Sequence, residues 1–273
     1  MSAGGGVTRA LACSVLGVIT GCGGASPLLH PAHVLPAGEV RATSGVSAQA
    51  AVGQLAGDLD RAYDLASRDP SLPGAPGSNA DYAKGALVAA AVAPGLAPVV
   101  GARVGVGGAF EGGVTYTGRG ARLDLRRAFQ RKAVAVSVGA GLNAAFLGRP
   151  ANPALPGVAL GSARAYGIDV PLIAGWRSEA SLYQAWAGLR GGYNRVTIAP
   201  VSSEPGGAAT SNEMAADHLY FGALAGVAIG LGHVHVGLEL DATWQVVTGT
   251  FNGTSTAVSG LVIAPASAIM WDF

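Results

Sequence analysis

One stretch of the chain, from His233 to Val246, interleaves two rows of residues of opposite character. The apolar row is Val234, Val236, Leu238, Leu240, Ala242, Trp244 and Val246, and the polar row is His233, His235, Gly237, Glu239, Asp241, Thr243 and Gln245. A period of two places the rows on opposite faces of a β-strand. The apolar face is long enough for the roughly 9–11 residues that cross a bilayer as a tilted strand. The polar face suits the interior of a barrel, so the stretch predicts one membrane-spanning strand.

The composition points in the same direction. The chain has 273 residues, of which 50% are hydrophobic, 12% are charged and 43 are Gly. This glycine content is far above the usual share of about 7%. It argues against a helical core and suits closely spaced, tilted strands around a narrow interior. The net charge of +1 and the scattered Lys and Arg residues exclude a nucleic-acid partner.

Alternating segments recur along the second part of the chain and predict about ten strands. Their ranges are 84–93, 97–106, 109–117, 121–129, 133–146, 164–176, 180–194, 218–229, 233–247 and 258–273. Eight strands remain an alternative, if Gly118 to Gly120 is a kink and 84–93 lies outside the sheet. The predicted fold is all-β: an antiparallel transmembrane β-barrel of 8–10 strands, with ten favoured.

The connections between these strands fall into two groups by length. Residues 107–108, 130–131, 177–178 and 230–232 form short turns, whereas 147–163, 195–217 and 248–257 form long loops that are polar or rich in Pro and Gly. If the chain starts in the periplasm, all short turns fall on the periplasmic side and all long loops outside. Outer-membrane barrels have this asymmetry.

The last residues supply a family resemblance. Ile269, Trp271 and Phe273 alternate with Met270 and Asp272, and the final residue is aromatic. This ending resembles the C-terminal strand of bacterial outer-membrane β-barrel proteins. The resemblance implies that Trp271 and Phe273 form an assembly signal. It also implies that outer-membrane lipid and the barrel-assembly machinery are partners.

The first residues form an export signal. Arg9 precedes an apolar run from Ala10 to Ile19, which has the roughly 7–15 residues of a signal-peptide core. The run ends in Ile19-Thr20-Gly21-Cys22, which is similar to the bacterial lipobox. The resemblance implies a signal peptide over 1–21 and a lipidated Cys22 as the new N-terminus; ordinary cleavage nearby is the alternative. Because the other cysteine, Cys13, also lies in this segment, no disulfide is expected.

Between the signal and the barrel, residues 22–80 are expected to form a periplasmic linker with one short helix. The stretch from Gly23 to about Ser44 is rich in Pro, Gly and Ala and is predicted to be a flexible tether. Apolar residues at helical spacing predict a helix over 47–67, either on the periplasmic side or plugging the barrel mouth. Residues 81–273 are then the outer-membrane barrel.

Eight charged residues are predicted to form a network inside the barrel, because they occupy the inward rows of the strands. They are Arg103, Arg122, Asp124, Arg126, Asp169, Arg190, Glu239 and Asp241. Four basic and four acidic groups in a narrow lumen should pair, since an unpaired buried charge is unfavourable. The functional alternative is a narrow polar pore.

Three other patterns could carry chemistry, and none supports a catalytic or metal site. His233 and His235 share one face but lack a third ligand, so no metal is expected. Asp217-His218, close to Glu213, is similar to the rim of the omptin proteases only over a dipeptide, with no second carboxylate pair. The Gly-rich run 101–113 approaches a dinucleotide fingerprint but no helix follows, so no cofactor is expected.

The sequence therefore predicts a non-enzymatic outer-membrane barrel with a surface, structural or binding role. The binding would use the three long loops, which carry residues such as Asn152, Glu204, Asn212 and Asn252 and would meet an extracellular ligand. Two alternatives are open. One is a narrow solute pore or a hydrolase at the rim, and the other is a soluble periplasmic lipocalin-like barrel with its apolar rows inside.

Overall fold

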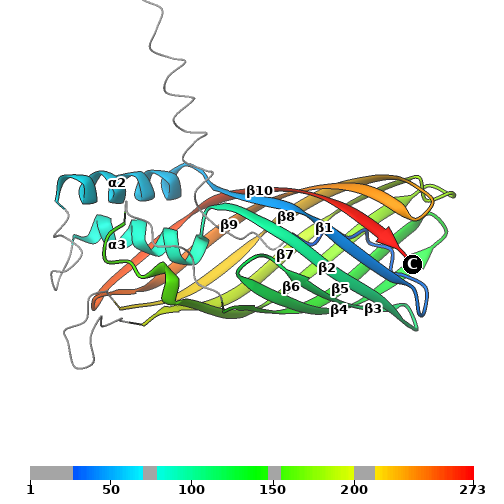
Figure 1. Ribbon diagram of the computed structural model, residues 1–273, viewed down its shortest axis with the longest axis horizontal. Coiled ribbons are helices and arrows are strands. Elements are labelled where there is room, and N and C mark those ends of the chain that lie inside the picture. Colours follow the sequence, from blue (N-terminus) through cyan, green and yellow to red (C-terminus); the bar gives the residue numbers. More distant parts are fainter. Residues whose placement is uncertain (1–26, 70–78, 147–154, 200–212) are drawn as a thin grey trace, which may run out of the picture.

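The chain folds into a closed antiparallel β-barrel of ten strands. The computed structural model describes residues 27–69, 79–146, 155–199 and 213–273. Around the barrel each strand pairs with its neighbours in sequence, and β1 closes the ring by pairing with β10 (Figure 1). The prediction of an all-β antiparallel barrel with ten strands is confirmed.

The strands differ greatly in length. Their bounds are β1 Val40–Ala51, β2 Gly95–Gly107, β3 Phe110–Tyr116, β4 Gly120–Arg131, β5 Val134–Ala145, β6 Ala163–Arg177, β7 Tyr183–Ile198, β8 Met214–Leu231, β9 Val234–Phe251 and β10 Thr254–Asp272. Strand β3 has 7 residues, whereas β8, β9 and β10 have 18, 18 and 19. The last three strands therefore form a tall wall on one side of the barrel.

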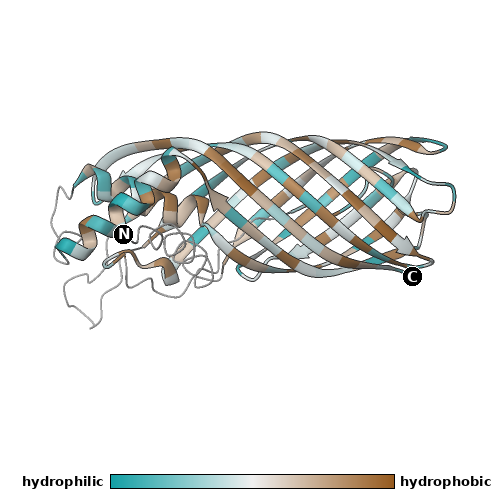
Figure 2. Cartoon of the chain, turned by 90° about the horizontal axis from the view of Figure 1, so that it is seen from above, coloured by the Kyte–Doolittle hydropathy of each residue, from teal (hydrophilic) through white to brown (hydrophobic). Residues whose placement is uncertain are grey.

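Alternation along the strands separates an apolar outer face from a polar lumen. On β9, Leu238 and Leu240 are 54% and 51% exposed, while Glu239 and Asp241 are buried inside. Figure 2 shows hydrophobic and hydrophilic residues alternating along the strands of the barrel. A lipocalin-like barrel requires the apolar rows to face inward. The prediction of that alternative is therefore wrong.

Large aromatic residues lie on the outer face of the barrel. Phe129, Phe146, Trp176, Tyr193, Phe221, Trp244, Trp271 and Phe273 are exposed. The rings of Trp271 and Phe273 stack with their centroids 5.4 Å apart. The terminal aromatic pair is therefore displayed on the outside of β10 and at its end.

Two predictions about the first strand are wrong. Residues 84–93 are helical: α3 spans Ala80–Leu87 and continues as the π-helix η2, Val88–Val92. The Asn79 side chain accepts a hydrogen bond from the Asp81 N–H and caps α3, and the alanine-rich run that follows favours helix. The first strand is instead β1, which lies inside the segment expected to be a linker. Residues 40–51 therefore belong to the barrel.

Another helix, α2, precedes α3 in the chain. It spans Gln54–Arg68 and overlaps the predicted helix over 47–67. It follows β1 directly and packs against α3, where a Cβ on Gly85 would lie only 2.2 Å from Ala62 Cβ. No helix in the described part of the chain is both long and apolar enough to cross a membrane. Both helices lie in the β1–β2 connection, at the left end of the barrel in Figure 1.

We call this left end the cap end and the opposite end the turn end. All four predicted short turns connect strands at the turn end, namely β2–β3, β4–β5, β6–β7 and β8–β9. The predicted long loop 248–257 is wrong, because β9 and β10 continue through most of it. They join at the cap end through Asn252 and Gly253, whose φ angles of 49° and 78° suit a two-residue hairpin turn.

The other predicted loops lie at the cap end and are only partly described. Residues 155–163 include the short 3-10 helix η3, Leu160–Ser162, and residues 195–198 and 214–217 extend β7 and β8. Asn152, Glu204 and Asn212 lie outside the described residues, as do Cys22 and the signal segment 1–21.

Candidate functional site

The lumen is the candidate site, and its first layer, at the turn end, is a piece of the chain itself. Residues 27–36, which we call the plug, run inside the barrel before the chain turns into β1. Leu29, His30 and Ala32 are 2%, 0% and 0% exposed. The prediction of a flexible tether here is wrong, because the barrel wall surrounds this segment.

Charged side chains of the wall bind the backbone of the plug. Both oxygens of Glu239 accept hydrogen bonds from the plug, one from the Leu28 N–H at 2.7 Å and one from the Leu29 N–H at 2.9 Å. A second carboxylate, Glu111, accepts from the Leu35 N–H at 2.9 Å. An extended segment away from water needs such partners, because its own N–H groups do not pair with each other.

The carbonyl groups of the plug have a cationic partner. Arg126 donates to the Pro31 carbonyl oxygen and, at 3.0 Å, to that of His33. The same guanidinium donates to Glu111. The two residues therefore neutralise each other's charge while each holds a different part of the plug backbone.

An apolar pocket receives the start of the plug. Leu28 belongs to a buried cluster with Ala32, Ala135, Ile173, Trp186, Leu224, Ala228 and Met270. The Trp186 indole N–H donates to Glu239 at 2.9 Å, so the same carboxylate accepts from the wall and from the plug. A Cβ on Gly226 would lie 2.3 Å from the Trp186 ring, which shows that this glycine makes room for the indole.

Two histidines of the plug are buried near positive charges and without good hydrogen-bond partners for their rings among the described residues. None of the ring nitrogens of His30 and His33 has a hydrogen-bond partner of normal geometry in the described part of the chain. Burial, followed by the charges of Arg126, Arg103 and Arg122, lowers the pKa of His30 well below its usual value. Burial, followed by Arg177 and Arg126, lowers the pKa of His33 to about 4. Both rings are therefore neutral at pH 7.

The second layer is a belt of ion pairs across the middle of the lumen. Asp124 accepts from Arg103 and Arg122, and Asp169 accepts from Arg122 and Arg190. Arg190 also lies 3.5 Å from Asp241. The belt thus runs without a break from β2 to β9. All of these side chains are almost fully buried, and each guanidinium has two carboxylate partners.

The structure places all eight predicted lumen residues inside the barrel and divides them between the two layers. Six form the belt, whereas Arg126 and Glu239 hold the plug. Sequence reasoning missed Glu111, although it lies on the inward row of β3 between the outward residues Phe110 and Gly112. Gly141 makes room for the belt, because a Cβ there would lie 2.3 Å from an oxygen of Asp169.

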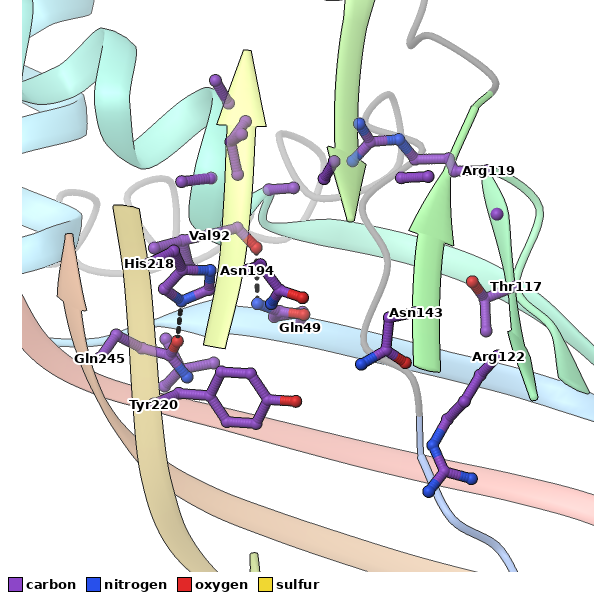
Figure 3. A pocket seen from close by; sticks show the side chains of 18 of the residues that line it. Gln49, Val92, Thr117, Arg119, Arg122, Asn143, Asn194, His218, Tyr220 and Gln245 are labelled. Atoms are coloured by element: carbon purple, nitrogen blue, oxygen red, sulfur yellow. Dashed lines mark hydrogen bonds between the residues drawn. The ribbon is translucent and has the colours of Figure 1, made fainter. Parts of the chain in front are cut away.

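The third layer is a cavity of about 170 Å³ between the belt and the helix η2. Polar side chains of the wall line it, together with the alanines 90, 91 and 93 and Val92 of the cap (Figure 3). The Gln49 amide donates to the Val92 carbonyl oxygen at 2.5 Å, which ties β1 to the end of η2. The cap-end half of the lumen is therefore bordered by η2 but not filled.

His218 lies in this cavity and not at the rim. Its ring contacts the side-chain oxygen of Gln245, whose amide donates to Thr243 at 2.6 Å (Figure 3). Asp217 faces outward and accepts from Arg195 at 2.7 Å and from the Tyr193 hydroxyl. The two members of the Asp217-His218 dipeptide thus lie on opposite faces of the sheet and cannot act as an acid–base pair.

The other histidine pair is also separated. His235 is buried, and its ring contacts the Ser181 carbonyl oxygen at 3.0 Å, whereas His233 is exposed in the turn before β9. The expectation that both histidines share one face of a strand is wrong, because the strand begins at Val234. Within the described ranges, no three His, Cys, Asp or Glu residues are grouped so that they could hold a metal ion.

Comparisons with known proteins give little beyond this geometry. No protein-family model matches the chain, and no curated protein matches it. Among solved structures the chain is similar to the crystal structure of Neisserial surface protein A, at 11% sequence identity. The match covers 86% of this chain and 96% of that chain, with a TM-score of 0.31. A similarity of this size says nothing further about the present barrel.

Proposed function

We propose that the chain is a non-enzymatic, non-conducting barrel of the bacterial outer membrane that presents its cap end to the outside as a binding surface. The observation that carries this proposal is the division between an exposed apolar outer face and a lumen that the plug and the belt obstruct. A closed barrel with an apolar exterior satisfies all backbone groups in lipid. A solute pore would first require the plug and the belt to move.

The outer face supports a position in a bilayer. Exposed apolar side chains such as Val236, Leu238 and Leu240 continue around the sheet, over an area much larger than the few hundred Å² usual for soluble proteins. Near the turn end, the Arg127 guanidinium lies 5.3 Å from the Phe110 ring centre and 5.2 Å from that of Phe129. A cation between two aromatic rings suits the headgroup region of a membrane.

We further propose that the turn end faces the periplasm. The start of β1 and the end of β10 lie at that end, and all four connections between strands there are short. At the cap end β3–β4 and β9–β10 are also joined by short turns, but β1–β2, β5–β6 and β7–β8 are joined by long connections. Among the connections between described strands, the long ones therefore occur at the cap end alone, as on the outer side of outer-membrane barrels. In this orientation Trp271 and Phe273 are the signal for the barrel-assembly machinery, and lipidation of Cys22 attaches the N-terminus to the membrane. Outer-membrane lipid surrounds the apolar bands.

The tall wall formed by β8, β9 and β10 supports a binding role for the cap end. Beyond the apolar band, its outer face is polar, and a shallow hollow of about 600 Å³ lies over it and the adjacent β7. The hollow is lined by Arg195, Ala215, Asp217, Thr248, Gly249, Thr250, Ser255, Thr256 and Ala257. A polar sheet that projects beyond lipid offers an extracellular ligand a rigid surface, in addition to the loops.

Two measurements test this proposal. The first is electrophoresis of the outer-membrane fraction with and without boiling, for which we expect a mobility shift. The second is labelling of a Thr250→Cys variant on intact cells, with the unsubstituted chain as the control for background labelling, for which we expect reaction with a membrane-impermeant maleimide. Recovery of the protein in the soluble periplasmic fraction, or steady ion conductance of the purified barrel in a planar bilayer at pH 7, would contradict the proposal.

A further inference from the structure

We propose that residues 27–36 are a releasable plug, which occupies the turn-end half of the lumen at neutral pH and leaves it on acidification. This inference goes beyond the proposed function, because it concerns a change of state inside the barrel. It rests on two observations, which are how the plug is held and what the plug carries into the lumen.

The wall holds the plug through its backbone. The five hydrogen bonds to charged side chains go to main-chain groups: three N–H groups bind Glu239 and Glu111, and two carbonyl oxygens bind Arg126. The plug joins the wall at one end, through the turn in which the Glu39 N–H donates to the Pro36 carbonyl oxygen at 3.2 Å. These hydrogen bonds, and the packing of Leu28 and Ala32 in the apolar cluster, involve side chains of the wall and no strand pairing. The plug can therefore leave without unfolding a strand.

The plug also carries two side chains that oppose its burial. A static plug would be most stable with apolar residues at positions 30 and 33, but both positions are histidines whose ring nitrogens lack good partners. Close to the rings, the protein supplies mainly positive charge, and only the backbone of Pro31 and of Lys132 favours the protonated forms. Protonation would thus place a new cation beside existing guanidinium groups.

Charged groups surround the plug on every side. Those on the neighbouring strands and turns are Arg103, Glu111, Arg122, Asp124, Arg126, Lys132, Arg177, Arg190, Glu239 and Asp241. The carboxylates among them are already bound to guanidinium groups, to backbone N–H groups or to Trp186. None of them has a hydrogen bond to either imidazole within the part of the chain that the structure describes.

The sign of the pH effect follows from these positions. In the released segment the imidazoles have ordinary pKa values near about 6.5. In the seated plug the pKa of His30 is well below that value and the pKa of His33 is about 4. Between about pH 4 and pH 6.5 the released state therefore binds more protons than the seated state. The seated state is fully favoured above about pH 6.5 and is lost progressively as the pH falls toward 4.

Amide hydrogen exchange followed by mass spectrometry tests the proposal on the full chain in detergent micelles. Protection of the peptide that contains Leu28 to Leu35, corrected for the intrinsic rate, should fall at least about tenfold between pH 7.0 and 5.5, because each proton taken up on release contributes up to tenfold per pH unit. Protection of the β9 peptide around Leu238 should stay constant. Unchanged protection of the plug would overturn the proposal.

Two variants separate plug release from other effects of acid. His30→Leu/His33→Leu should keep the plug protected at pH 5.5; equal loss of protection in this variant would assign the effect to Glu111 or Glu239 and overturn the histidine mechanism. A lock made from Ala32→Cys and Gly175→Cys joins neighbouring positions, since a Cβ on Gly175 would lie 2.9 Å from Ala32 Cβ. The Cβ atoms of a disulfide are about 3.5–4.5 Å apart, so the plug moves slightly when the bond forms. The oxidised lock should stay protected at pH 5.5 and the reduced form should not. Loss of protection in the oxidised form would show exchange without release.

Discussion

The two halves of the lumen have the same kind of wall but different contents. In the turn-end half the wall surrounds an extended segment, and in the cap-end half it faces the helix η2. The plug brings backbone N–H and C=O groups that cannot pair with each other, so Glu239, Glu111 and Arg126 bind them. The helix satisfies most of its own backbone groups, and Gln49 donates to the Val92 carbonyl oxygen at its end. In the turn-end half, charged side chains of the wall therefore bind the plug. In the cap-end half a cavity is left beside η2.

The largest expected effect is the loss of a carboxylate in the turn-end half. Glu111→Ala leaves Arg103, Arg126 and the Leu35 N–H without their shared acceptor in a site with no solvent exposure. We expect destabilisation of about 3–5 kcal/mol, because a broken buried pair leaves an uncompensated charge. Urea denaturation in detergent, followed by tryptophan fluorescence, measures it.

A matched control uses an ion pair on the outer face. Asp217→Ala removes the partner of Arg195 and Tyr193 at a solvent-exposed position, where salt bridges contribute little. We expect the urea midpoint of this variant to stay close to that of the parent. Equal shifts for Glu111→Ala and Asp217→Ala would show that the lumen pairs are no more buried than the outer ones.

The next comparison enlarges one side chain in each half of the lumen. Gly226→Ala puts a methyl group 2.3 Å from the Trp186 ring, and overpacking of this kind is unfavourable by about 1–3 kcal/mol. Ala90→Val extends a residue that lines the cavity, and we expect a change below about 0.5 kcal/mol. The same urea titration compares the two. A larger penalty for Ala90→Val than for Gly226→Ala would contradict the difference in filling.

A loss smaller than those of Glu111→Ala and Gly226→Ala is expected at the helices α2 and α3 of the cap end. The Tyr82 hydroxyl donates to the Pro156 carbonyl oxygen at 2.6 Å, and its ring packs against Phe251 with centroids 5.9 Å apart. Tyr82→Phe keeps the ring and removes one hydrogen bond, so the expected loss is about 1 kcal/mol. Limited proteolysis should detect this as faster cleavage in α2 and α3, with the barrel fragment unchanged. Faster cleavage within the strands would mean that the cap is not a separate unit of stability.

Long strands that cross the apolar band could be predicted from sequence, because alternation there has a physical cause. The outward residues of β9 from Val234 to Trp244 are apolar and, except for Ala242, large, and the register follows from them. Beyond the apolar band the outward residues need not be apolar, so nothing requires the sequence to alternate. The Thr- and Gly-rich stretch 248–257 continues two strands without an apolar row, so it is indistinguishable from a loop in the sequence.

Other parts of the molecule could not be predicted for different reasons. Strand β1 has small outward residues, such as Ala42 and Ser44, which give a weak periodic signal. The plug is rich in proline and resembles a tether, and it becomes ordered only through partners far away in sequence. Leu28 and Glu239 are separated by 211 positions. The alternation of the strands predicts that the charged side chains of the wall point into the lumen. Which of them bind the plug and which form the belt depends on that long-range contact.

The chain's own residues 27–36 fill the turn-end half of the lumen in this structure. Disulfide formation between Ala32→Cys and Gly175→Cys in the outer-membrane fraction at pH 7.5 tests this directly, with the unsubstituted chain and each single variant as controls. We expect an intramolecular disulfide in the double variant and poor reaction of Ala32→Cys alone with a membrane-impermeant maleimide. A free, readily labelled Ala32→Cys thiol and no crosslink would contradict it.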